Sequence, residues 1–132
     1  MNKIGEFKEL VYMLKYACEH AESEIEVGAV FHRFTSCFDL LHGIVAELAE
    51  CRGIGTGSVR ECFIQALHSG IIPEEVFPLP MLDDREDIRN GSAESHASEV
   101  FDRIGGIYIP ALVEMAEQLD AEWGEENSIE AE

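Results

Sequence analysis

Residues 27–48 read VGAVFHRFTSCFDLLHGIVAEL, and this stretch decides the fold class of the chain. Its large apolar side chains recur at alternating steps of four and three residues, at Val27, Phe31, Phe34, Phe38, Leu41, Val45 and Leu48. An α-helix completes a turn every ~3.6 residues, so this spacing places all of them on one face. The stretch therefore predicts a long helix with a continuous apolar face directed at a core.

The segments on either side of this stretch follow the same pattern. Residues 3–23 predict a first helix, because their apolar side chains recur at steps of three and four. The glycines of residues 53–57 end the long helix, since repeated glycine is costly in a helix. Ser58 and Glu61 then form the spacing of a capping box, which starts a third helix that Gly70 ends.

Two further helices are expected in the second half of the chain. Residues 80–90 predict a short fourth helix after an irregular connection that carries prolines. A fifth helix begins near Ser95, and the glycines at 105–106 together with Pro110 should bend it. Its apolar positions are Ala97, Phe101, Ile104, Tyr108, Leu112, Met115 and Leu119.

Length and hydropathy fit one domain. The chain has 132 residues, of which 46% are hydrophobic, enough to build a core. We predict an all-α fold, an up-and-down four-helix bundle with an additional short helix, about five helices in total. The bundle is expected over residues 1–121, followed by an acidic C-terminal tail over residues 122–132. Since no apolar run is long enough for a membrane span or a signal peptide, we expect a soluble, cytoplasmic protein without a membrane partner.

Charge restricts the classes of partner and site. Nine Lys and Arg residues oppose 27 Asp and Glu, a net charge of -18. Nucleic-acid binding draws its affinity from cations that neutralise phosphates, so this charge argues against a nucleic-acid partner. The five His and four Cys residues show no paired ligand spacing beyond a single Asp39-x-x-His42. We therefore expect no metal site and no cofactor.

The richest cluster of candidate functional residues lies between positions 81 and 96. Arg85 and Arg89 are separated by four residues, which places them on one face of the fourth helix, and His96 follows. Carboxylates at positions 83, 84, 86 and 87 surround the two arginines. Two interpretations stay open: a surface ion-pair network, or a cationic ligand-binding site in which Arg85 and Arg89 hold a phosphate or a partner's carboxylate.

An ordered set of short motifs resembles a known family. The motifs are Arg33-Phe34, Phe38-Asp39-Leu40, Ser58-Val59-Arg60-Glu61, Ala66, Gly70-Ile71-Ile72, Met81-Leu82-Asp83-Asp84-Arg85, and Ala97 with Phe101 and Ile104. In order and spacing they are similar to the nucleotidyltransferase substrate-binding proteins, HEPN-fold helical bundles of the HepT type. The similarity spans roughly residues 25–120.

The resemblance implies a homodimer that pairs with a separate minimal nucleotidyltransferase. Such pairs are interpreted either as a split enzyme with a substrate-binding subunit or as a toxin–antitoxin module. In the second case the bundle is a metal-independent ribonuclease with the motif Arg-x4-His-x-Tyr. The His transfers protons at the ribose hydroxyl, the Arg stabilises the charged phosphorane, and the partner adenylylates the Tyr.

The sequence departs from this motif at its central positions. Arg85 matches the motif Arg, but Asn90 stands at the His position and Ser92 at the Tyr position. An amide transfers no proton near neutral pH, so the motif is degenerate in this register. A shifted register offers Arg89 and His96 as catalytic candidates.

Three hypotheses follow. The favoured one is a binding or partner subunit of a minimal nucleotidyltransferase without its own catalysis. The alternatives are an active metal-independent ribonuclease toxin that uses Arg89 and His96, and a structural bundle that shares only the fold.

Overall fold

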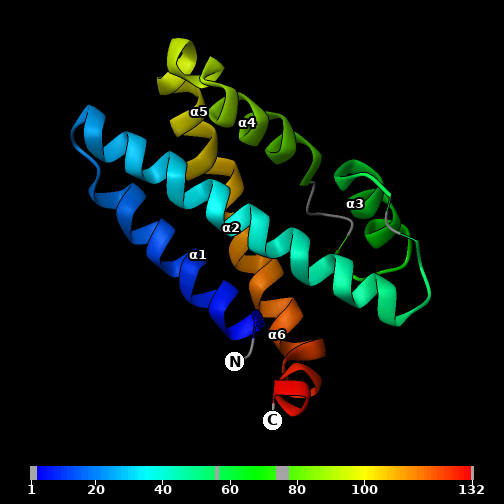
Figure 1. Cartoon of the computed structure of the whole chain (residues 1–132). Coiled ribbons are helices and arrows are strands. Elements are labelled where there is room, and N and C mark those ends of the chain that lie inside the picture. The colour runs from blue at the N-terminus through cyan, green and yellow to red at the C-terminus, as the bar shows by residue number, and fades with distance from the viewer. Residues whose placement is uncertain (1–2, 56, 74–77, 132) are drawn as a thin grey trace.

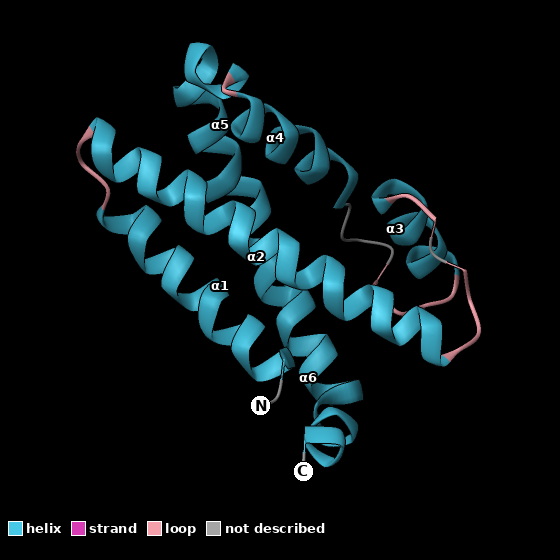
Figure 2. Ribbon diagram, viewed as in Figure 1, coloured by secondary structure: helices cyan, strands magenta, loops and turns pink. Residues whose placement is uncertain are grey.

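The computed structural model describes residues 3–55, 57–73 and 78–131, and all secondary structure in these ranges is helical (Figures 1 and 2). The helices are α1 (Lys3–His20), α2 (Glu24–Cys51), α3 (Val59–His68), α4 (Pro78–Asn90), α5 (Ala97–Arg103) and α6 (Ile109–Ala131). A 3-10 turn, Ser92–His96, precedes α5, and a π-helical segment, Ile104–Tyr108, joins α5 to α6. Since α5, the π segment and α6 follow one another without a break, the prediction of an all-α bundle of about five helices is confirmed.

Helix α2 is the centre of the bundle. It packs against α1, α3, α4 and α5, while α1 also packs along α6 (Figure 1). The side chains of its apolar face from Phe31 to Val45 are buried, whereas Val27 and Leu48 at the two ends are partly covered. The spacing that predicted the helix therefore also identifies the side chains around which the other helices pack.

The first connection lies earlier in the chain than the sequence suggested. The first helix was predicted to reach Ser23 but ends at His20, because Ser23 caps the next helix. Its Oγ accepts a hydrogen bond from the Glu26 amide at 3.1 Å and donates one to the Glu26 carboxylate at 3.0 Å. A side-chain oxygen at this position satisfies an amide that has no partner within the helix, so Ser23 favours a new start over continuation.

The third and fourth helices show how capping and proline define helix starts. Ser58 accepts a hydrogen bond from the Glu61 amide at 3.1 Å, the contact expected of the capping box. Gly70 follows the helix end with a φ of 78°, a conformation that glycine adopts without steric cost. The fourth helix was predicted from Pro80 but begins at Pro78, since proline is tolerated in a first turn, where its missing amide would have no partner. Of the predicted irregular connection, residues 74–77 lie outside the described ranges.

The bend predicted in the last helix corresponds to a change of helix type. Gly105 and Gly106 lie within the π segment, and Pro110 follows directly in the first turn of α6. Proline clashes with the carbonyl four residues earlier in a regular α-helix, and the wider π turn relieves that clash. The amide of Ile109 accordingly donates to the carbonyl of Ile104, five residues back.

Helix α6 runs through residue 121 to Ala131, so the backbone of residues 122–131 is helical. The division into a bundle over residues 1–121 and an acidic tail over residues 122–132 stays a prediction. No helix in the described ranges is both long enough and apolar enough to cross a membrane.

Candidate functional site on helix α4

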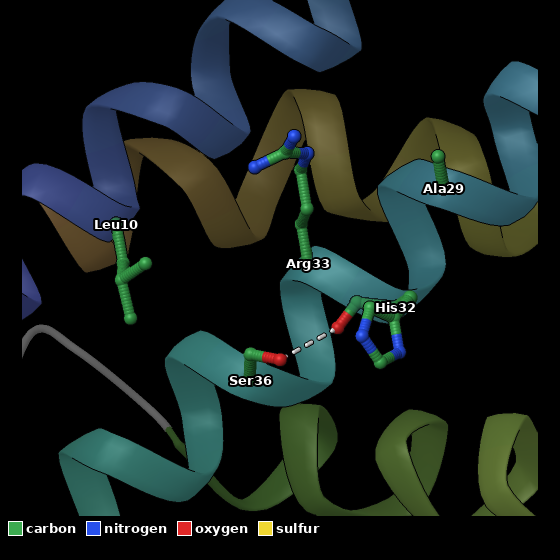
Figure 3. A pocket seen from close by; sticks show the side chains of 5 residues that line it. All are labelled: Leu10, Ala29, His32, Arg33 and Ser36. Atoms are coloured by element: carbon green, nitrogen blue, oxygen red, sulfur yellow. Dashed lines mark hydrogen bonds between the residues drawn. The ribbon is translucent and has the colours of Figure 1, made fainter.

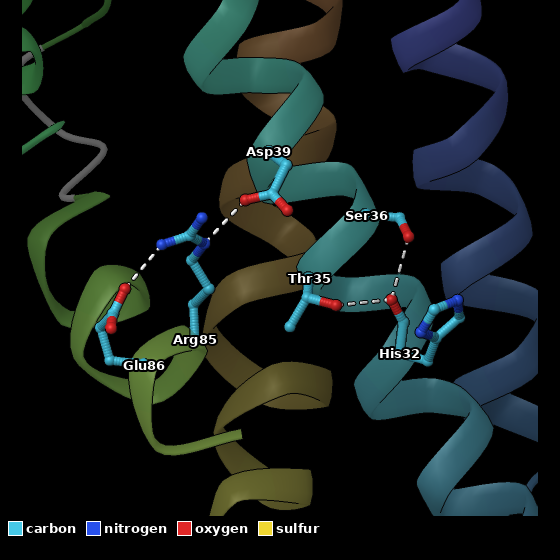
Figure 4. Close-up of polar contacts among 6 residues, drawn as sticks. All are labelled: His32, Thr35, Ser36, Asp39, Arg85 and Glu86. Carbon is cyan, nitrogen blue, oxygen red and sulfur yellow. Dashed lines mark hydrogen bonds and ion pairs between the residues drawn. The ribbon is translucent and has the colours of Figure 1, made fainter. Parts of the chain in front are cut away.

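Arg85 is bound by carboxylates on two helices. Its Nε donates to Asp39 Oδ1 of α2 at 2.7 Å, and its Nη1 donates to Glu86 Oε1 at 2.6 Å (Figure 4). Only 11% of the Arg85 side chain is exposed, and its guanidinium carbon lies 5.8 Å from the centre of the Phe38 ring. The geometry favours the ion-pair interpretation for this arginine, because the carboxylates occupy its hydrogen-bond donors and balance its charge.

Arg89 differs from Arg85 although both lie on α4. Its side chain is exposed and forms no hydrogen bond or ion pair with any described residue. The structure therefore does not join the two arginines into one cationic site. Arg89 remains the cation on α4 that is available to an external anion.

Asn90 has a structural part in ending α4. Its Oδ1 accepts a hydrogen bond from the Ser92 amide at 2.8 Å, across Gly91, whose φ is 85°. This is an Asx turn, a hydrogen-bonded turn that asparagine and aspartate side chains form with the amide two residues on. The side chain of Asn90, the residue at the His position of the resembled motif, thus closes a turn. Ser92 is exposed just beyond it.

His96 lies at the far end of the 3-10 turn. Its ring is exposed, and its Nε2 lies 3.2 Å from Ser95 Oγ. Arg89 is also exposed and lies on the other side of the same turn, but no hydrogen bond joins the two side chains. The shifted register therefore brings the two candidates to one end of the molecule without assembling them into a hydrogen-bonded site.

A buried network that the sequence did not predict lies next to Arg85. Asp84 is 5% exposed, and Arg103 of α5 holds both of its oxygens, with Nε and Nη2 each 2.8 Å from one of them. The Tyr108 hydroxyl donates to Asp84 Oδ2 at 2.5 Å and lies 3.2 Å from the carbonyl of Pro80 (Tyr108 also stacks on Phe34 of α2). The network joins α4 to α5 and to the end of the π segment.

The network fixes the ionisation of its members. Burial raises the pKa of the Asp84 carboxyl, but the hydrogen bonds from Arg103 and Tyr108 and the charge of Arg103 outweigh it, and the pKa of Asp84 is lowered. Burial and the Asp84 carboxylate both raise the pKa of Tyr108. Asp84 is therefore a carboxylate at neutral pH and Tyr108 a neutral donor, which suits a structural contact better than proton transfer.

One signal in the sequence could have identified this carboxylate. Asp84 lies three residues after the buried Met81 and four before the partly buried Ile88, a position where the apolar face of α4 requires an inward side chain. A charged residue at such a position needs a buried partner.

His42 on α2 borders the same region. Its ring is partly buried and lies 5.9 Å from the ring of Phe63. Burial and the nearby charge of Arg85 lower the pKa of His42, although Asp39 opposes the shift. The imidazole is therefore held in its neutral form, with one ring nitrogen able to accept a proton.

The remaining chemistry of the region is limited. In the part of the chain that the structure describes, no three His, Cys, Asp or Glu side chains gather in a way that could hold a metal ion. No protein-family model, curated protein or solved structure matches this chain. The side chains around α4 offer ion pairs, one external cation at Arg89 and one neutral imidazole at His42.

Proposed function

We propose that this chain is a binding subunit that pairs with a minimal nucleotidyltransferase and has no catalysis of its own. One observation carries the proposal: the Asn90 side chain closes the turn after α4, at the position where a ribonuclease of the resembled family has its His. Arg85, at the motif Arg, is held by Asp39 and Glu86. Two of the positions needed for RNA cleavage thus hold the fold together instead.

Charge supports the same conclusion. At a net charge of -18 the molecule repels RNA at long range, and Arg85 and Arg103 at this end are already paired with carboxylates. A protein partner with a basic surface is instead attracted to this negatively charged molecule. We propose that the partner binds at the end of α4, where Arg89 contacts a carboxylate within a largely basic surface, and that the chain forms a homodimer, as the resemblance implies.

Affinity purification from the native cells tests this proposal. The tagged chain should retain, in near-equal amount, a small protein with nucleotidyltransferase sequence motifs, identified by mass spectrometry. An Arg89→Glu variant should retain less of it, whereas Arg60→Glu, an exposed reversal on α3, should retain the parental amount. Recovery of the folded chain without such a protein would contradict the proposal.

A second candidate function keeps one specific observation in its favour. Arg89 and His96 are both exposed and lack ion pairs with the described residues. Arg89 lies shortly before the 3-10 turn and His96 is its last residue. They would supply a cation and a proton-transfer group to a metal-independent ribonuclease, the toxin of a toxin–antitoxin pair.

An RNA-cleavage assay distinguishes this alternative from the favoured proposal. On the favoured proposal, the purified chain in the presence of a metal chelator leaves RNA intact, and its expression alone does not arrest growth. RNA cleavage that His96→Ala lowers by about a hundredfold or more, while His68→Ala leaves it unchanged, would establish the ribonuclease instead.

A further inference from the structure

A cavity of about 330 Å³ lies between α1 and α2, and it shares no residue with the α4 site. Figure 3 shows its lining, in which one side chain comes from α1 and four come from α2. The lining residues are Leu10, Ala29, His32, Arg33 and Ser36. The volume is at the small end of the range for small-molecule sites.

Arg33 is the cationic group among the lining residues, and no described residue forms an ion pair with it. Lys3, Lys8, Arg60, Arg85 and Arg103 all take part in ion pairs. Arg33 forms no ion pair or hydrogen bond with the described residues, in a chain where carboxylates outnumber cations threefold. Its five N–H donors are therefore open to an external acceptor.

The neighbouring groups define what an occupant can be. Ser36 Oγ donates to the carbonyl of His32 at 3.1 Å, so the hydroxyl hydrogen is already used (Figure 4). The lining residues with donor groups left to offer are Arg33, through its guanidinium, and His32, through its ring, while Leu10 and Ala29 provide apolar surface. An occupant thus needs one acceptor group beside an apolar body.

We propose that this cavity binds a small monocarboxylate with an apolar body. A carboxylate accepts two parallel hydrogen bonds from one guanidinium, which matches a lining with a single arginine. A dianionic phosphate would bring a second charge to a site without a second Lys or Arg, and the net charge of -18 opposes each added negative charge. This site is independent of the proposed pairing with a nucleotidyltransferase.

Benzoate is the probe, and benzamide is its neutral counterpart of nearly equal shape. We expect a benzoate titration of the full chain, monitored by amide NMR, to saturate with a Kd of about 1 mM. The chemical-shift changes should centre on Leu10, Ala29 and Arg33. Benzamide should bind at least about tenfold more weakly than benzoate, because it lacks the charge that strengthens both hydrogen bonds. Inorganic phosphate should also bind more weakly than benzoate.

Two matched variants separate a built site from general attraction to arginine. Arg33→Gln should weaken benzoate binding about tenfold, whereas Arg89→Gln should leave it unchanged. Arg89 is also an exposed arginine without an ion pair to the described residues, but it lies on α4. Because Arg33 is exposed, both variants should keep the parental amide spectrum away from the cavity. A flat benzoate titration, equal binding of benzamide, tighter binding of phosphate, or an unchanged Kd in folded Arg33→Gln would each overturn the proposal.

Discussion

Two neighbouring residues of opposite charge tie α4 to the bundle in two directions. Asp84 is held by Arg103 of α5, and Arg85 reaches Asp39 of α2. Asp84 is the more deeply buried of the two, and its ionised form depends on its partners. At the scale of single residues, these contacts hold α4 against α2 and α5.

Replacing Asp84 by Asn should cost about 2–3 kcal/mol of unfolding free energy, because Arg103 loses its counter-charge in a partly buried contact. The exposed part of the Arg103 side chain keeps the cost below that of a fully buried pair. Urea denaturation measures it. The adjacent Asp83→Asn is the control, since its pair with Arg60 is exposed and contributes less than about 1 kcal/mol. Equal costs at the two positions would contradict the role of the buried network.

His42 makes stability depend on pH in a defined window. Its pKa is lowered in the fold, so the neutral form favours the folded state above the ordinary pKa, and this contribution is lost as pH falls through that value towards the lowered one. The unfolding free energy should therefore fall between pH 7.5 and 5.5, and fall less in His42→Gln. Parallel curves for His42→Gln and the parent would exclude this role.

The four cysteines should react at very different rates. All are free thiols, Cys37 is buried, and Cys51 is exposed. Burial raises the pKa of Cys37 to about 12, so it offers almost no thiolate at neutral pH. A thiol reagent should label Cys51 first and Cys37 only on unfolding, as mass spectrometry of short reaction times would show. Early labelling of Cys37 in the folded chain would contradict its burial in the core.

At the scale of helices, α2 was largely predictable from its own residues, because burial on one face imposes a spacing that a sequence displays. The start at Ser23 was missed because a capping serine and a serine in a helix end look alike until the partner amide is placed. The candidate site was less predictable. Arg85 and Arg89 share a helix face in sequence terms, yet only the packing of α2 supplies Asp39 to one of them. The Asp84 network depends on residues 19 and 24 positions away, and no local pattern reports such a pairing.

Phe38 tests the central position of α2. It is fully buried, between Phe34 on its own helix and Phe63 of α3, and Phe38→Ala should cost about 3–5 kcal/mol of unfolding free energy. Ile25→Ala on the same helix should change it by less than about 0.5 kcal/mol, because that side chain is 87% exposed. Chemical denaturation followed by circular dichroism measures both. A cost below about 1 kcal/mol for Phe38→Ala would mean that the face of α2 does not form the core.

At the scale of the whole molecule, one set of contacts joins the C-terminal ends of α2 and α3 to α6. The Arg52 guanidinium lies 4.7 Å from the centre of the Trp123 ring of α6 and donates to the carbonyl of Ser69, after α3, at 2.9 Å. A cation over an indole face contributes up to about 1 kcal/mol at a partly exposed site. Trp123 is the chain's single tryptophan, so tryptophan fluorescence reports on the surroundings of this one indole.

Arg52→Ala should therefore shift the tryptophan emission to longer wavelength and raise quenching by iodide, since the indole gains access to water. Arg60→Ala removes an exposed arginine of α3 and should leave the emission unchanged. An identical emission spectrum for Arg52→Ala and the parent would show that α6 does not dock at this end of α2.

The π segment has a consequence for how the molecule opens. The hydrogen bond from Ile109 to Ile104 spans five residues instead of four, and Pro110 contributes no amide, so the regular four-residue spacing of the hydrogen-bond ladder is interrupted between α5 and α6. Fraying of one of these helices therefore need not propagate into the other. In native-state hydrogen exchange, the amides of 112–119 and those of 100–103 should open as two units with separate free energies. Opening in a single step would show that the π segment does not separate the two helices.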